Sequence, residues 1–106
     1  MLSGDKKHLD NIKNLIKEKY GDLILSLYFY GSRATSNKVD ADFDILLITD
    51  NKIDWKTEYE LSRLIINYGI FNDLVIDLQI LSSSEFERGI NYHPYLINVK
   101  NTGVIC

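Results

Sequence analysis

The stretch YGSRATSNKVDADFDILL, residues 30–47, joins two strongly apolar segments through a Gly-Ser turn and two aspartates spaced two residues apart. The segment before the turn, residues 23–30 (LILSLYFY), is apolar and rich in aromatic side chains, and residues 42–49 (DFDILLIT) form a second apolar run. Runs of this length and composition favour buried strands. The stretch therefore predicts two core strands and, between them, a polar connection over Ser32–Lys38 with room for one helical turn.

The segments on either side of this stretch predict further helices and a third strand. Apolar residues at helical spacing indicate an amphipathic helix over Asp5–Tyr20. Asp54 is suited to cap a helix over Trp55–Tyr68, which Gly69 would end, and Asp73–Leu81 is a third apolar run. Serines 82–84 followed by Glu85 predict a short helix beginning near Glu85, and Pro94 and Gly103 would begin and close another.

This order predicts an α/β (α+β) chain with a small mixed β-sheet and helices packed mainly on one face. At 106 residues it has the size of one domain, and we expect that domain to span residues 1–106. The net charge of −3 argues against a protein that grips nucleic acid by neutralising many phosphates. Cys106 is the only cysteine, which leaves no disulfide framework and no cysteine-based zinc site. No apolar run approaches the about 20 residues that span a bilayer, so we expect a cytoplasmic location without a membrane partner.

Two aspartates lie at the mouth of the second predicted strand. Side chains alternate along a strand, so Asp42 and Asp44 face the same way, with Cα atoms about 6.5–7 Å apart. Unpaired, such carboxylates would repel each other, and at least one pKa would rise unless a cation lay between them. Mg²⁺ is a natural counterion for this arrangement. Asp77 interrupts the third apolar run and is suited to add a third carboxylate. The alternative is that these aspartates are simply paired with backbone amides, lysine or arginine.

Gly31 and Ser32 follow the first strand at the point where a ligand could approach the backbone. Glycine permits a conformation that other residues resist, and a serine at the start of a helical turn offers a hydroxyl and backbone N–H groups to phosphate oxygens. An ordinary turn with a capping serine is the alternative. Tyr28 and Tyr30 are interpreted as core residues of the first strand, and the two histidines, His8 and His93, are too far apart in the sequence to suggest a metal pair.

Together, Gly31-Ser32-Arg33-Ala34 and Asp42-Phe43-Asp44 resemble the signature of the polymerase-beta-type nucleotidyltransferase superfamily, specifically its minimal, MNT antitoxin-like members. In that family a third carboxylate lies on a later strand, at the place of Asp77. The resemblance implies the nucleotidyltransferase fold and a site with two Mg²⁺ ions held by the three aspartates. It also implies that ATP phosphates are bound at Gly31 and Ser32, with Arg33 facing the phosphates.

The same resemblance implies transfer of AMP from ATP to a hydroxyl of a partner protein. The partner would be a HEPN-domain protein, and the chain would be the antitoxin of a toxin–antitoxin pair. The alternative is a catalytically weak or inactive module that neutralises its partner by occlusion. Family members often carry Arg-Gly where this chain has Thr35-Ser36, and a serine where it has Ala41, which favours that alternative.

Overall fold

The computed structural model describes residues 3–36 and 40–106. Its elements run in the order α1 (Ser3–Tyr20), β1 (Ile24–Tyr30), α2 (Gly31–Ser36), β2 (Phe43–Thr49), α3 (Trp55–Phe71), β3 (Ile76–Ser82), α4 (Ser83–Gly89), α5 (Pro94–Thr102) and β4 (Val104–Ile105). The helical turn expected in the polar connection is α2. The part of that connection at positions 37–39 lies outside the described residues. Within the described ranges, no helix combines the length and apolar character that crossing a membrane requires.

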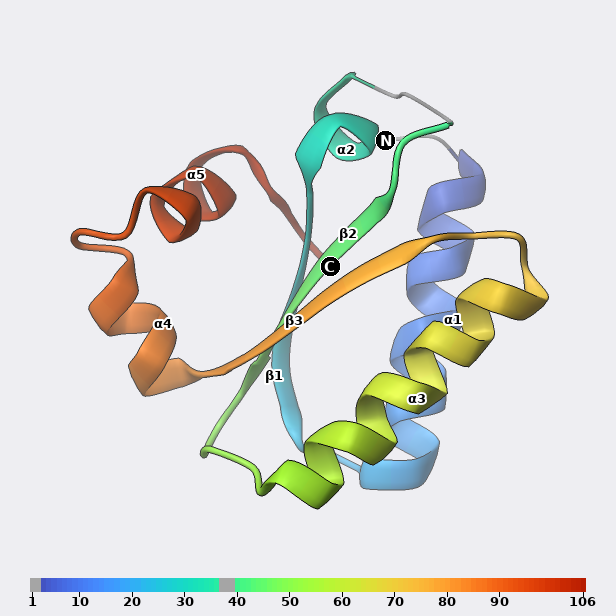
Figure 1. Cartoon of the computed structure of the whole chain (residues 1–106), viewed down its shortest axis with the longest axis horizontal. Helices are drawn as coiled ribbons and strands as arrows, with labels where there is room; N and C mark the ends of the chain where they lie inside the picture. Colours follow the sequence, from blue (N-terminus) through green and yellow to red (C-terminus); the bar gives the residue numbers. More distant parts are fainter. Residues whose placement is uncertain (1–2, 37–39) are drawn as a thin grey trace.

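The four described strands form one mixed sheet in the order β3-β2-β1-β4 (Figure 1). β1 pairs antiparallel with β2 and with the short β4, whereas β2 and β3 run parallel. Parallel neighbours need a crossover connection, and α3 supplies it between β2 and β3. The α+β class and the mixed sheet expected from the sequence are confirmed.

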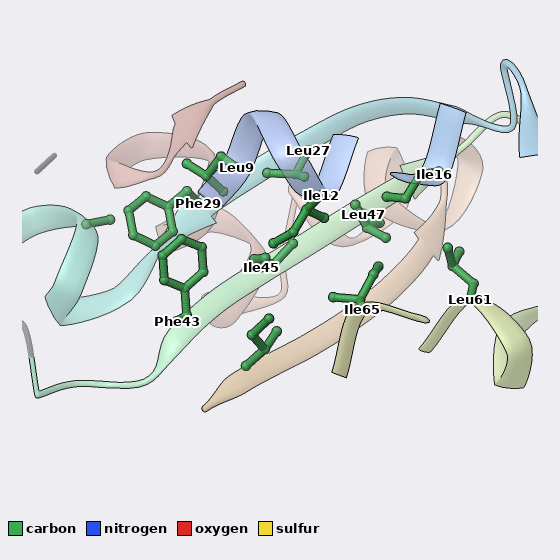
Figure 2. Packing of buried hydrophobic residues seen from close by; sticks show 12 residues of the cluster. Leu9, Ile12, Ile16, Leu27, Phe29, Phe43, Ile45, Leu47, Leu61 and Ile65 are labelled. Atoms are coloured by element: carbon green, nitrogen blue, oxygen red, sulfur yellow. The ribbon is translucent and has the colours of Figure 1, made fainter. Parts of the chain in front are cut away.

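One face of the sheet packs against the two long helices, α1 and α3 (Figure 1). Alternate residues of the two central strands point to this side and meet apolar residues of both helices, as Figure 2 shows. The rings of Phe29 and Phe43 stack at 4.5 Å between centroids near one end of this cluster. Its fully or nearly fully buried members include Leu9, Ile12, Ile16, Leu27, Phe29, Phe43, Ile45, Leu47, Leu61 and Ile65.

The opposite face carries a second, smaller core under the short helices α4 and α5. Tyr28, Tyr30 and Leu46 of the sheet pack there with Phe86 of α4 and Leu96 of α5. The two long helices cover one face of the sheet. The two short helices bury the other side of the central strands. Asp44 alternates with Phe43 and Ile45, so it points to the α4 and α5 side.

The boundaries around β3 differ from those expected. α3 continues past Tyr68 to Phe71, so Gly69 does not end the helix. Gly69 is buried, and a Cβ built there would lie only 2.7 Å from the Leu74 carbonyl oxygen. The glycine therefore allows the chain to turn back closely against the helix. Asp73 has a φ of 56° and belongs to that turn, and the strand begins only at Ile76.

The third apolar run forms β3, which is an edge strand and therefore only partly buried. It pairs with β2 on one side, and its burial alternates along the strand. Ile76, Leu78 and Ile80 pack into the core under the two long helices, whereas Asp77 is exposed, so its charge stays in water and needs no buried partner.

Apart from Gly69, the predicted helix caps at Asp54, Ser82 and Gly103 are confirmed. The Asp54 side chain accepts a hydrogen bond of 2.8 Å from the Thr57 backbone N–H at the start of α3. Ser82 and Glu85 form a capping box at the start of α4. Gly103 caps α5, whose first residue is Pro94. These local signals fix where helices begin because they satisfy backbone groups that the helix itself leaves unpaired.

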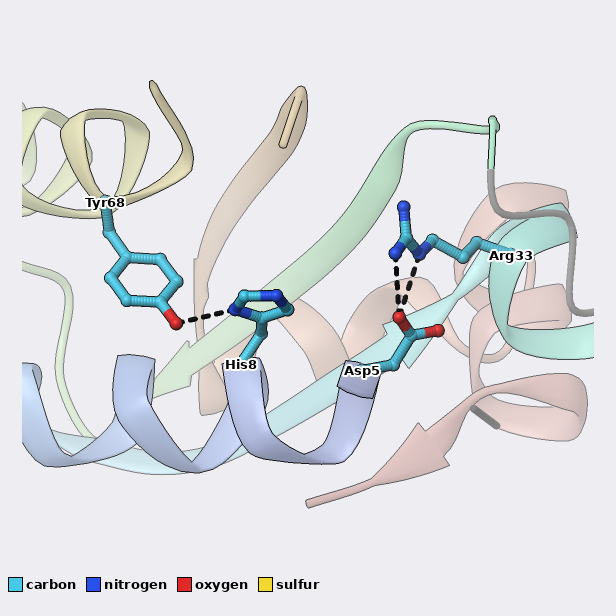
Figure 3. Close-up of polar contacts among 4 residues, drawn as sticks. All are labelled: Asp5, His8, Arg33 and Tyr68. Atoms are coloured by element: carbon cyan, nitrogen blue, oxygen red, sulfur yellow. Dashed lines mark hydrogen bonds and ion pairs between the residues drawn. The ribbon is translucent and has the colours of Figure 1, made fainter. Parts of the chain in front are cut away.

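A buried ion pair ties α2 to the first turn of α1 (Figure 3). Arg33 Nη2 and Nε donate to Asp5 Oδ1 at 2.8 and 3.0 Å, and Asp5 is 1% exposed. The Arg33 guanidinium also lies over the Phe43 ring, 5.2 Å from its centroid. In the same region the Tyr68 hydroxyl lies 2.7 Å from His8 Nδ1, which links α3 to α1. His8 therefore joins the two long helices.

Replacing Asp5 with alanine should destabilise the fold. The change removes the buried carboxylate to which the Arg33 guanidinium is bonded, and breaking such a pair from one side costs about 3 kcal/mol. The matched control is Asp10→Ala, an exposed position of the same helix, which should stay within about 0.5 kcal/mol of the wild type. Urea unfolding measures both free energies. Equal unfolding midpoints for the two variants would contradict the structural importance of the pair.

Candidate active site

The sheet brings two of the three predicted carboxylates side by side. Asp44 of β2 is the register partner of Asp77 on the parallel strand β3, and neighbouring strands lie about 4.8 Å apart. Asp42 precedes β2 by one residue and is exposed. On the other side of Asp44, the register partner is Tyr30 of β1. Asp44 is therefore the centre of a row that crosses three strands.

The electrostatics of this row are unfavourable for a charged Asp44. Burial, then the negative charges of Asp77 and Asp42, raise the pKa of Asp44 to about 6. The ion pair found among residues 3–36 and 40–106 is that of Arg33 with Asp5, so no ion pair in these ranges offsets the charge of Asp44. A carboxyl in this setting gains from any cation that approaches the row.

The three carboxylates do not meet closely enough to form a ready-made cage. In the part of the chain that the structure describes, no group of three or more His, Cys, Asp or Glu side chains could hold a metal ion together. Asp44 is partly buried, whereas Asp42 and Asp77 are both exposed. The assignment of Asp42, Asp44 and Asp77 as joint metal ligands remains a prediction.

The backbone of Gly31 lies directly against the Asp44 carboxylate. Its φ is 82°, in the left-handed region, and a Cβ built there would lie 2.1 Å from Asp44 Oδ2. Any other residue would therefore be strained and would also displace the carboxylate. Ser32 is exposed on the first turn of α2. The structure thus brings the Gly31 turn to Asp44.

Arg33 lies on the other side of the sheet from these carboxylates. Its ion pair with Asp5 and its contact with Phe43 belong to the face covered by α1, whereas Asp44 points to the α4 and α5 side. The three predicted nucleotide-binding residues are therefore divided in this structure. Gly31 lies against Asp44 and is followed by the exposed Ser32, whereas Arg33 fixes α2 to α1 on the opposite face.

Two tyrosines that sequence reasoning did not place in the site complete its wall. The hydroxyls of Tyr30 and Tyr95 are 2.5 Å apart, and their rings meet edge to face. Burial, the hydrogen bond with Tyr95 and the charges of Asp44 and Asp77 raise the pKa of Tyr30. Burial and the same two charges raise the pKa of Tyr95. The alternation of side chains placed Tyr30 on one of two faces, but the sequence alone did not show that Asp44 shares that face.

A groove continues from this wall along the edge strand. It has a volume of about 420 Å³, within the range of small-molecule sites. Residues of β3 line one side, and α4, α5 and the loop between them line the other. The side chains along it include Gln79, Leu81, Arg88, Tyr92, His93 and Tyr95.

Sequence comparisons identify no relatives of this chain. A scan of protein-family models found no match, and a search of curated protein sequences found none either.

Solved structures match the fold over nearly the whole chain. A mutant of the toxin–antitoxin MntA–HpeT matches 91% of this chain and 69% of its own, with 14% identity and a TM-score of 0.60. A protein from Sulfolobus solfataricus assigned as a nucleotidyltransferase matches 93% of this chain and 76% of its own, with 22% identity and a TM-score of 0.59. A complex of a tri-AMPylated Shewanella oneidensis HEPN toxin with an MNT antitoxin matches 95% and 70%, with 16% identity and a TM-score of 0.57.

The chain therefore has the minimal nucleotidyltransferase fold. At these identities the likeness concerns the path of the backbone. The chemistry of the chain depends on its own residues.

Asp44 should make stability depend on pH. Its folded pKa of about 6 lies above the ordinary value, so its contribution to stability is present below about pH 4 and is lost as the pH rises through 6. Asparagine at position 44 cannot ionise, so the free energy of unfolding of Asp44→Asn relative to the wild type should increase by about 1 kcal/mol as the pH rises from about 4 to 7. This value allows for solvent screening of a partly exposed group. Urea unfolding across this range measures the gap.

The control for this measurement is Asp50→Asn, at an exposed aspartate just past the other end of β2. Its unfolding free energy should stay within about 0.5 kcal/mol of the wild type throughout. If the difference in unfolding free energy between Asp44→Asn and the wild type does not change with pH, the raised pKa of Asp44 is contradicted.

Proposed function

We propose that this chain is a metal-dependent nucleotidyltransferase that transfers AMP from ATP to a hydroxyl of a partner protein. The observation that carries the proposal is the position of Asp44. Its carboxylate lies against the Gly31 turn and beside Asp77, with no ion pair to offset its charge among the described residues. In the minimal nucleotidyltransferase fold, this places a concentration of negative charge next to a turn suited to phosphate oxygens.

The donor set fits Mg²⁺. Carboxylate oxygens are its preferred protein ligands, one or two carboxylates usually suffice, and substrate phosphates and water complete the shell. Asp44 and Asp42 would hold the ion on the triphosphate, and Asp77 would help to hold a second. Bound there, the ions would supply charge neutralisation for the transferred phosphoryl group. The raised pKa of Asp44 supports this fit, because a bound cation would relieve the repulsion that raises it.

The chain's own residues would mainly position the reactants. The Gly31 turn and the exposed Ser32 would receive the outer phosphates, while the ion pair of Arg33 with Asp5 keeps α2 in place. Asp77, exposed at the sheet edge, would orient the incoming hydroxyl and accept its hydrogen bond. Phosphoryl transfer gains most from such positioning and from electrostatic stabilisation.

For the acceptor, we propose a HEPN-domain protein, with this chain as the antitoxin of the pair. Two of the similar structures are toxin–antitoxin complexes, and in one of them an AMPylated HEPN toxin is bound to an MNT antitoxin. The net charge of −3 disfavours nucleic acid as the acceptor.

A binding module without transfer activity is the second candidate. The separation of the three carboxylates favours it, since no joint metal cluster is formed among the described residues. Thr35 also favours it. Its hydroxyl bonds to the Gly31 carbonyl at 3.0 Å, at a position where nucleotidyltransferases of the resembled family often carry arginine.

Incubation with ATP labelled at its α-phosphate, Mg²⁺ and the protein encoded by the neighbouring gene tests the proposal. The neighbour should become labelled, and chelation of Mg²⁺ with EDTA should abolish the reaction. Asp42→Ala and Asp44→Ala should each reduce the rate by about 100-fold or more, because each removes a charge needed at the transferred phosphoryl group. Asp50→Ala is the matched control and should label the neighbour as the wild type does.

One result would contradict the proposed transfer activity. If the neighbour is never labelled, yet is bound and inhibited equally by the wild type and both variants, the chain acts by occlusion.

A further inference from the structure

The Tyr95 hydroxyl lies at the Tyr30 end of the row formed by Tyr30, Asp44 and Asp77. It is bonded to the hydroxyl of Tyr30, whose register partner is Asp44. Burial and the charges of Asp77 and Asp44 raise the pKa of Tyr95, so its phenol is protonated before it attacks. These contacts bring a nucleophilic side chain of the chain itself to the proposed reaction centre.

Tyr95 is also held firmly in this position. It is the second residue of α5, and the next residue, Leu96, is 5% exposed. Leu96 packs so closely on α4 that a Cβ built at Gly89 would lie 2.2 Å from Leu96 Cδ1. The hydroxyl of Tyr95 is therefore presented by a packed helix, and a fixed geometry lowers the entropic cost of an attack.

Tyr95 differs from the neighbouring tyrosines in access. Tyr30 and Tyr28 are each 8% exposed and belong to the core under α4 and α5. Tyr92 is 72% exposed in the loop before α5. Tyr95, at 37% exposed, combines a polar contact inside the site with an open side.

We propose that Tyr95 is a site of self-nucleotidylation, at which the chain transfers AMP to its own phenol. The inference rests on the proposed nucleotidyltransferase function. The Tyr95 oxygen attacks the α-phosphorus of a nucleoside triphosphate and forms a phosphodiester. The bond between the α-phosphorus and the bridging oxygen breaks, pyrophosphate leaves with that electron pair, and the phenolic proton passes to water.

The groove beside Tyr95 offers room for the attached nucleoside. It runs from Tyr95 between β3 and α4, and its volume of about 420 Å³ suits a ligand of this size. Arg88 and the aromatic ring of Tyr92 line it, and both are suited to stack on a base. A nucleotide attached to Tyr95 would stay next to the Tyr30 and Tyr95 pair and would obstruct a second triphosphate, so the modification would switch the site off.

The test uses the purified full chain with α-labelled ATP and Mg²⁺, first alone and then with the neighbouring gene's protein. Peptide mass spectrometry should locate a single AMP on Tyr95 of the wild type. Tyr95→Phe should lose the label, whereas the matched control Tyr59→Phe, at an exposed tyrosine of α3 away from the groove, should keep it. Circular dichroism checks that both variants fold. Because the reaction is intramolecular, its first-order rate constant should not change with protein concentration.

The outcomes separate the two proposals. Label on the neighbouring protein but none on the wild-type chain would overturn self-modification and leave the proposed function standing. Label on neither protein would remove the proposed function and this inference together. Label that maps to another residue of the chain, label that survives in Tyr95→Phe, or a rate constant proportional to protein concentration would each overturn self-modification in the chain's own site.

Discussion

The position of Asp44 on the central strand is the constraint on which the site depends. β2 has neighbours on both sides and is otherwise buried along its length, so a carboxylate near its start is covered by the sheet from two directions. A slip of one residue in β2 would move Asp44 to the core beneath α1 and expose Phe43. The register therefore decides that the charge opens toward Gly31, Tyr30 and Asp77.

The short α2 connects this charge to the rest of the fold in two opposite directions. Gly31 lies against the Asp44 carboxylate, where only the absence of a side chain allows the contact. Two residues later, Arg33 reaches the other face of the sheet and is bonded to the buried Asp5. The turn is thus fixed from behind by an ion pair while its front remains open. A turn held in this way beside a repelling pair of carboxylates would suit the cation and phosphate groups of the proposed reaction.

Much of this architecture could be predicted because it follows from local signals. The caps at Asp54 and Ser82 and the alternation in β1 and β2 depend on residues close in the sequence. The end of α3 could not be predicted, because Gly69 serves a contact with Leu74 that the folded chain creates. The role of Arg33 was hidden for the same reason, since its partner Asp5 lies 28 residues earlier. The Tyr30 and Tyr95 pair likewise depends on how α5 lies over the sheet, whereas the proximity of Asp44 and Asp77 was suggested by their places on two predicted strands.

In the proposed function, the charge of Asp44 is electrostatically unfavourable, and a metal-bound nucleotide would relieve it. The most direct measurement is an NMR titration of the Asp44 carboxyl carbon, with and without Mg²⁺ and a non-hydrolysable ATP analogue. Without them the midpoint should lie at about 6, and their addition should move it to lower pH. A midpoint near the ordinary value of about 3.9 that does not respond to Mg²⁺ and the analogue would contradict the account.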